Sequence, residues 1–146
     1  MRFETSVAIN APADLIWTTM IDVESWPQST ASITSVVRLD GGPFQLGSRA
    51  RIKQPKVPRM VWTVTEFEPL RQFTWTVNSA GVTTIARHIL TPGPAQSTTV
   101  TLSIDRVGML AAVVDLLTAG LTKRYIAMEA EGLKRVCETE SIATAA

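Results

Sequence analysis

The sequence predicts an α+β fold in which about seven strands form a curved antiparallel sheet that packs on a long C-terminal helix. Three observations predict it. Apolar and polar residues alternate in several short stretches, no helix-length segment separates those stretches between residues 32 and 106, and the last third repeats apolar residues at steps of three and four. Strands that follow one another through short turns pair antiparallel, which gives this fold class.

The first 30 residues predict one strand and two short helices. Alternate residues from Phe3 to Ile9 are mostly apolar and share one face of a strand. Asn10 is available near the cap of a first helix, and Pro12 suits its first turn. A second short helical turn is expected through "DVESWPQ", with Pro27 ending it.

Six further strands are predicted between turn signals. The turns contain the stretches "DGGP", "PKVP", "EPLR" and "TPGP", which are rich in glycine or proline. In the first of the six strands, Ile33, Ser35, Val37 and Leu39 are expected to share a face. The predicted strands cover residues 33–39, 48–54, 61–67, 72–77, 82–90 and 97–106.

A single amphipathic helix is predicted from Met109 to about Glu138, since this segment lacks proline. Before Lys123 it is apolar nearly all round, so we expect burial against the sheet and contact with a cavity. Its later half carries charges, among them Glu129 and Glu131, expected on a solvated face. Residues 1–146 are expected to form one domain, with 139–146 as a frayed tail.

Composition favours an internal apolar surface and argues against nucleic-acid binding. Hydrophobic residues make up 45% of the chain and charged residues 18%, and the net charge is +1. The densest basic stretch, "RARIK" at 49–53, alternates like the solvent face of a strand. We therefore expect a small hydrophobic partner and no nucleic acid.

No metal, cofactor or stable membrane insertion is expected. Cys137 is the only cysteine and His88 the only histidine, so neither a disulfide within the chain nor a Cys/His zinc site can form. The N-terminus alternates and does not resemble a signal peptide, which favours a cytoplasmic protein. The most apolar run, 108–121, is too short to span a bilayer. The oligomeric state is expected to be monomer or homodimer.

Several stretches, taken together, resemble a known family. They are "INAPADLIW", "DVESWPQ", "GSRARIKQP", "VWTVTEFEPLRQFTW", "AGVTTIARHILTP", "STTVTLSI" and "RYIAMEAEGLKRVCE". In this order they resemble the START-like (SRPBCC) superfamily, in particular its polyketide cyclase/dehydrase and lipid-transport family, from about Phe3 to Glu138. The resemblance implies a helix-grip fold with a deep apolar cavity between sheet and C-terminal helix, used to bind lipids, hormones or polyketides and in some members to catalyse cyclisation or dehydration.

His88 is the candidate polar residue of that cavity. It alternates with Arg87 in "VTTIARHIL", and arginine is the residue least suited to an apolar interior, so His88 should point inward. Three roles remain open: holding the polar end of a ligand, filling the core as a neutral imidazole, or moving a proton.

Large apolar side chains are expected to form the remaining wall. Trp17 is expected to pack the first helix, whereas Glu66 is either a cavity acid or a rim residue. The predicted ligand-binding residues are Trp26, Trp62, Phe73, Trp75, His88, Leu102, Met109, Val113, Leu117 and Leu121.

Three function classes follow. The first is a non-enzymatic binder of a hydrophobic or amphipathic molecule such as a lipid, an isoprenoid or a polyketide-like aromatic. The second is a cyclase or dehydratase in which His88 shuttles a proton; no other catalytic residue is predicted. The third, a module that docks to another protein, is not favoured because no exposed apolar patch can be read from the sequence.

Overall fold

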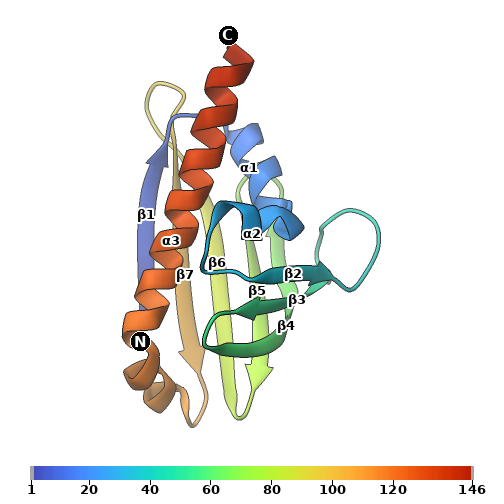
Figure 1. The fold of residues 1–146 in the computed structure, drawn as a ribbon, viewed down its shortest axis with the longest axis vertical. Helices are drawn as coiled ribbons and strands as arrows, with labels where there is room; N and C mark the ends of the chain where they lie inside the picture. Colours follow the sequence, from blue (N-terminus) through green and yellow to red (C-terminus); the bar gives the residue numbers. More distant parts are fainter. Residues whose placement is uncertain (1, 146) are drawn as a thin grey trace.

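The computed structural model describes residues 2–145, and within them it confirms the predicted fold class: a curved antiparallel sheet, short helices after the first strand and a long C-terminal helix (Figure 1). The elements are β1 (Arg2–Ile9), α1 (Ala13–Ile21), the 3-10 turn η1 (Val23–Ser25), α2 (Trp26–Ser29), β2 (Ser35–Arg38), β3 (Arg49–Gln54), β4 (Val57–Glu68), β5 (Gln72–Ser79), β6 (Val82–Pro92), β7 (Thr98–Val107) and α3 (Ala111–Ala145).

The strands lie in the order β1-β7-β6-β5-β4-β3-β2, and every neighbouring pair is antiparallel. The register shifts between Ile52 and Gln54 in β3, and again between Val64 and Glu66 in β4. Such bulges bend and twist a strand, which helps the sheet to curve. Helix α3 runs along one face of the curved sheet, over β1 and β7 (Figure 1).

An aromatic cluster forms the core between the sheet and the N-terminal helices. The ring of Phe73 lies 5.1 Å from that of Phe44 and 5.4 Å from that of Trp75. Trp17 packs against Phe67 at 5.4 Å, which confirms its predicted role in seating the first helix. Edge-to-face contacts of this kind stabilise beyond the area they bury.

Helix α3 passes very close to α2 at Gly132. A Cβ atom added there would lie 2.3 Å from the backbone oxygen of Ser29. The same oxygen accepts a hydrogen bond of 2.6 Å from Nη2 of Arg135, so the end of α2 is joined to α3 at this point. Only glycine allows the two backbones to approach this closely.

Two N-terminal predictions are wrong. Pro27 does not end the second helix but lies in the first turn of α2, where its missing N–H has no intrahelical partner to lose. In β2, Val36 is buried opposite Ile52, whereas Val37 is 47% exposed. The irregular backbone before Ser35 shifts the alternation by one residue, so Ile33 and Val37 do not share a face.

The first turns of α3 are also not as predicted. Met109 is 97% exposed, Leu116 79% and Leu117 78%, although burial of this apolar half was expected. Strand β7 ends at Val107, and this side of the helix faces away from the sheet. At its other end the helix continues past the predicted limit of Glu138 to Ala145; fraying of residues 139–146 stays a prediction.

Candidate functional site

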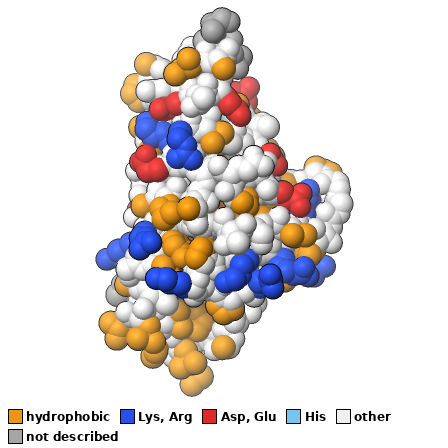
Figure 2. Space-filling view, viewed as in Figure 1, with side chains coloured by type: hydrophobic (Ala, Val, Ile, Leu, Met, Phe, Trp, Pro, Cys, Tyr) orange, Lys and Arg blue, Asp and Glu red, His pale blue; other side chains and the backbone are white. Residues whose placement is uncertain are grey.

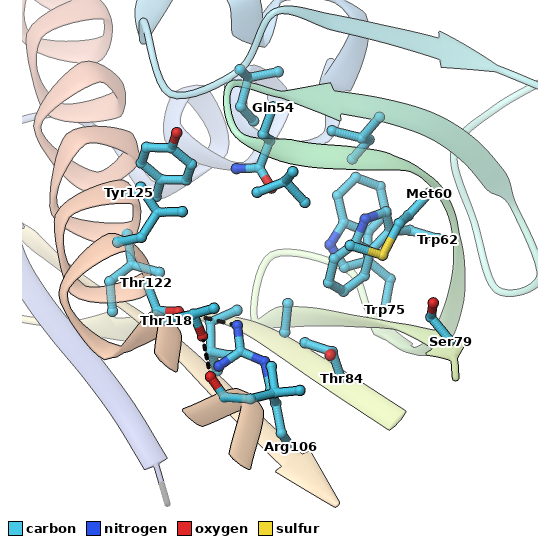
Figure 3. A pocket seen from close by; sticks show the side chains of 18 of the residues that line it. Gln54, Met60, Trp62, Trp75, Ser79, Thr84, Arg106, Thr118, Thr122 and Tyr125 are labelled. Carbon is cyan, nitrogen blue, oxygen red and sulfur yellow. Dashed lines mark hydrogen bonds between the residues drawn. The ribbon is translucent and has the colours of Figure 1, made fainter. Parts of the chain in front are cut away.

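A pocket of about 430 Å³ separates α3 from the sheet (Figure 3). Strands β3 to β7, helix α2 and the inner side of α3 all contribute to it. Most of the lining is apolar, and its larger side chains are Met60, Trp62, Trp75, Leu102, Leu121 and Ile126. Ligand pockets are commonly hollows of this size with apolar walls and a few polar groups.

Arg106 brings a positive charge to the helix side of the pocket. Its Nη1 forms an ion pair of 2.9 Å with Oδ1 of the buried Asp115, and its Nη2 donates to Oγ1 of Thr122 at 3.1 Å. An arginine at a low-dielectric wall needs such partners, because an unpaired buried charge is costly. The guanidinium is thus fixed at the end of β7 by two residues of α3. Figure 3 shows Arg106 beside Thr122 at the helix side of the pocket.

Two further polar side chains face the pocket from opposite elements. Tyr125 of α3 donates its hydroxyl to the backbone oxygen of Pro55 at 2.5 Å, which ties the helix to the β3–β4 turn. Gln54 of β3 donates from Nε2 to the backbone oxygen of Ser32 at 3.3 Å. Both side chains flank the pocket opposite Trp62 and Trp75 in Figure 3.

His88 is buried and points to the pocket side of β6, as predicted. Its ring stacks on Phe73, with the centroids 4.1 Å apart and the planes 9° from parallel. Nδ1 lies 3.3 Å from the backbone oxygen of Phe73, a contact that assigns the ring proton to Nδ1. Burial lowers the pKa of His88 to about 4, against a smaller opposing effect of that hydrogen bond.

The neutral ring therefore offers Nε2 as an acceptor. With the proton on Nδ1, the lone pair of Nε2 is available, and no hydrogen bond within residues 2–145 engages that atom. Trp26 and Trp75 enclose the ring at centroid distances of 5.6 and 6.0 Å. The site can accept a hydrogen bond in a largely aromatic environment.

Glu129 lies at the pocket, contrary to the prediction that it belongs to the solvated face of the last helix. A second hollow, of about 540 Å³, lies between α3 and the N-terminal helices. The two hollows share four residues: Trp26, His88, Leu102 and Glu129. Desolvation raises the pKa of Glu129 to about 7.

The four shared residues are here called the junction of the two hollows. At the junction the pKa of Glu129 lies above that of His88, the reverse of their usual order. His88 remains neutral at pH 7, whereas the raised pKa of Glu129 favours its protonated form far more than for an ordinary glutamate. Burial favours the uncharged form of both side chains. The junction is a place where one group accepts and another donates a hydrogen bond without a net charge.

The predicted site residues fall into three groups. Six of them line the pocket: Trp26, Trp62, Trp75, His88, Leu102 and Leu121. Phe73 lies behind the wall, fully buried under His88. The placement of Met109, Val113 and Leu117 at the wall is wrong, because Met109 is exposed in the turn before α3 and the other two occupy the side of α3 that faces solvent.

Glu66 does not reach the pocket. The bulge between Val64 and Glu66 shifts the alternation, so that Glu66 becomes exposed and Phe67 turns toward the core. Glu66 is exposed near the β4–β5 turn and lines neither hollow, so the cavity-acid alternative is wrong.

The polar lining residues other than His88 were missed. Arg106 shares a strand face with Leu102 and Ile104, so strand periodicity was a usable signal for it. Asp115, the only charge in the apolar run 108–121, was a second signal, since a buried carboxylate needs a cationic partner. For Gln54 and Tyr125 we find no comparable signal.

Among residues 2–145 no group of three or more His, Cys, Asp or Glu side chains is placed to hold a metal ion. Cys137 is buried under α1, and burial raises the pKa of its thiol to about 11. None of the helices within that range is long and apolar enough to cross a membrane.

The fold belongs to the class of helix-grip folds found in solved START-like structures. The structure of the Zhui aromatase/cyclase from Streptomyces sp. R1128 is similar to this one, with a TM-score of 0.77 and 18% sequence identity. The match covers 94% of this chain and 93% of that chain. A START superfamily protein from Mycobacterium smegmatis matches 92% of this chain and 97% of its own, with a TM-score of 0.71 and 20% identity. Likeness at these identities establishes the fold.

Within that class the family is also established. The model of the family described as polyketide cyclase / dehydrase and lipid transport matches residues 1–138, so the chain belongs to this family. The di-domain aromatase/cyclase StfQ from the steffimycin biosynthetic pathway is a further structural match, with a TM-score of 0.70, 14% identity, and coverage of 94% of this chain and 45% of its own. A comparison with curated protein sequences found no match.

Proposed function

We propose that this protein binds a hydrophobic or amphipathic small molecule, such as a lipid, an isoprenoid or a polyketide-like aromatic, in the pocket between α3 and the sheet. The observation that carries the proposal is the pocket itself, which combines three tryptophan walls with a buried, neutral histidine. Membership in a family that includes lipid transport supports the same class of ligand.

The two titratable groups at the junction suit a neutral oxygen function on the ligand. Nε2 of His88 accepts a hydrogen bond from a hydroxyl, phenol or enol, and the protonated carboxyl of Glu129 donates one to an oxygen atom. An anionic group at the junction would meet no cation among the four residues that the two hollows share, since Arg106 is paired with Asp115 and the exposed Lys56 and Arg59 line only the first hollow. We therefore favour a ligand that is uncharged at this end.

Binding is tested with 2-naphthol, a hydrophobic phenol, by quenching of the tryptophans that line the pocket. Thr84 lines the pocket, and Thr83 is its neighbour on the opposite face of β6. Thr84→Phe fills the hollow and should weaken binding about tenfold or more, whereas the matched Thr83→Phe should leave it unchanged. Equal binding by both variants contradicts the proposal, as does a wild-type protein that binds no apolar probe and carries no ligand in native mass spectrometry.

A second candidate function is a cyclase or dehydratase, the alternative in which His88 shuttles a proton. The observation that favours it is the pairing of a proton acceptor, His88, with a raised-pKa acid, Glu129, at one place in an apolar pocket. Two of the structural matches are aromatase/cyclase proteins. The low pKa of His88 makes it a weak base, so Glu129 is the better candidate for the acid step.

The enzyme alternative is tested with a poly-β-carbonyl thioester as substrate. Glu129→Gln keeps the shape and removes the titrating proton, so it should lower turnover and abolish the limb of the pH profile near 7. His88→Ala should lower turnover as well. If neither change alters the products or their rate, the enzyme reading is wrong, while the binding proposal stands on its own measurement.

The proposal also covers the location and the oligomeric state of the protein. The protein would work in the cytoplasm, as a monomer or a homodimer, without stable insertion in the membrane. Light scattering after size exclusion and fractionation of cells that express the tagged protein test these points.

A further inference from the structure

The end of β7, the turn after it and the first turns of α3 expose a group of large apolar side chains that are not part of the core. These residues, here called the apolar tip, are Val107, Met109, Leu110, Val113, Leu116 and Leu117. Each is at least half exposed, which contradicts the expectation that no exposed apolar patch exists. Hydrophobic side chains gather at this end of the molecule in Figure 2. Contiguous exposed apolar residues commonly mark an interaction site.

The tip has the periodicity of an amphipathic helix whose apolar side faces outward. Val113, Leu116 and Leu117 follow one another at helical spacing on the solvent side, while Asp115, one residue away, is buried on the inner side. The exposed leucines therefore form a continuous outer stripe. Nothing in residues 2–145 covers it.

Positive charges lie directly beyond the tip along the same side of the helix. Lys123 and Arg124 follow Leu116 and Leu117 by seven residues, so they share its outer side, about 10 Å farther along the helix axis. Both are exposed. An amphipathic surface helix buries its apolar part about 5–10 Å into the boundary between lipid headgroups and acyl chains, which would leave these cations at the level of the phosphates.

Further cations lie on the opposite side of the pocket, in the β3–β4 hairpin. Lys56 and Arg59 are exposed there, and the segment 41–65 contains no Asp or Glu. Figure 2 shows Lys and Arg side chains as a band beyond the hydrophobic end, with the Asp and Glu side chains of that face farther away. The charge around the tip is complementary to an anionic surface.

The pocket opens at this same end. Its lining includes the exposed residues Lys56, Arg59 and Ala80 from two β-turn regions, and also Leu110, which belongs to the tip. A ligand that enters or leaves by this route passes between the tip and the hairpin. A surface that holds the tip would therefore lie at the opening of the pocket.

We propose that the apolar tip and the cations beside it dock the protein reversibly on an anionic lipid bilayer, with the pocket opening toward the membrane. The contact is peripheral: the leucines of α3 enter the headgroup region, and Lys123, Arg124, Lys56 and Arg59 contact lipid phosphates. This inference does not depend on the identity of the ligand.

The test is co-sedimentation of the full chain with vesicles. Vesicles of equal parts phosphatidylglycerol and phosphatidylcholine should bind the protein, vesicles of phosphatidylcholine alone should bind it much less, and added salt should weaken binding. Leu116→Gln with Leu117→Gln should lower the affinity about tenfold or more, since both side chains are lost from the tip. Lys123→Gln with Arg124→Gln should lower it by a similar factor for anionic vesicles only.

The other end of the molecule supplies matched controls. Ile142 is 72% exposed at the far end of α3, and Arg71 is exposed in the β4–β5 turn. Ile142→Gln with Arg71→Gln should bind vesicles like the wild type. Circular dichroism and thermal unfolding check that each variant is folded.

Three results with vesicles would overturn the proposal: no binding of the wild type to anionic vesicles, equal loss in the control variant, or full binding by the tip variant. A dimer in solution that the tip substitutions dissociate would also overturn it, because a second copy of the chain would then be the occupant of the tip. Loss of 2-naphthol binding with intact vesicle binding would affect the function proposed above and leave this one standing.

Discussion

The two halves of α3 meet the rest of the protein in different ways. In the C-terminal half, here called the packed half, Ala130 and Cys137 are buried in the core and Gly132 touches the backbone of α2, while Leu133 and Val136 border the second hollow. In the N-terminal half, here called the open half, the inner side borders the pocket and the outer side exposes leucines. The helix is continuous, yet only its C-terminal half is anchored in the core.

This difference separates stability from function along one helix. Close packing leaves no room for a ligand, whereas a hollow lowers the number of contacts that hold the fold together. The packed half, with the aromatic cluster, is therefore expected to carry most of the folding free energy. Substitutions in the open half can therefore change the pocket lining or the exposed surface with a smaller loss of folding free energy.

The largest expected effect comes from the aromatic cluster on the sheet, compared with the open half of α3. Phe73 of β5 is fully buried and contacts Phe44, Trp75 and His88. Phe73→Ala should lower the free energy of unfolding by about 3–5 kcal/mol, because a large cavity is left in a close-packed cluster. Leu117→Ala, in the open half, should change it by less than about 0.5 kcal/mol. Urea unfolding measures both, and similar losses would show that the exposed leucines contribute to stability as the core does.

The pH dependence of stability isolates the junction residues. The folded-state pKa of His88 is about 4 instead of 6.5, so the unfolded chain takes up the proton first, and stability from this residue falls as pH drops from 6.5 to 4. The folded-state pKa of Glu129 is about 7 instead of 4.5, so its contribution falls as pH rises from 4.5 to 7. Between pH 4.5 and 6.5 the two slopes oppose each other.

Replacing either Glu129 or His88 should reveal the pH dependence of stability that the other residue causes. Glu129→Gln should make the protein gain about 3 kcal/mol of stability from His88 between pH 4 and 6.5. His88→Gln should give the opposite slope between pH 4.5 and 7. Urea unfolding across this range, with histidine titration by NMR, checks both signs; a His88 pKa near 6.5 in the folded protein would contradict the assigned burial.

The smallest expected effects on stability come from replacing two glycines, one in each half of α3. Gly132→Ala forces the backbone of α2 away and should cost about 1–3 kcal/mol. Gly120 lies in the open half, where an added Cβ meets nothing within 4 Å. Gly120→Ala should therefore stabilise the protein by about 0.5–1 kcal/mol through helix propensity. Thermal unfolding of both variants measures the difference, and a shift of the same sign in both would refute it.

The sheet was predictable because its signals are local. Alternation and turn residues set the strands, and the same alternation placed His88 inward. Bulges are not visible in an alternating pattern, so Glu66 could not be assigned to one side. Irregular backbone before Ser35 likewise hid the change of face in β2.

The inner side of α3 was harder to predict for a physical reason. Its inner positions include Asp115, Thr118, Thr122 and Glu129, because a pocket needs polar groups on its wall. A prediction from apolar periodicity assumes that the buried side of a helix is its apolar side. In this helix the assumption selected exposed residues, Leu117 among them, as the wall.

Trp26 is the side chain that stands between the two hollows. Its indole Nε1 donates to the backbone oxygen of Met20 at 3.0 Å, which fixes the ring where both hollows share it with His88, Leu102 and Glu129. The partition therefore consists of side chains and can be changed without altering the backbone. Shortening Trp26 is expected to join the two spaces into one longer chamber, which makes this residue the natural starting point for redesigning the protein to accept larger cargo.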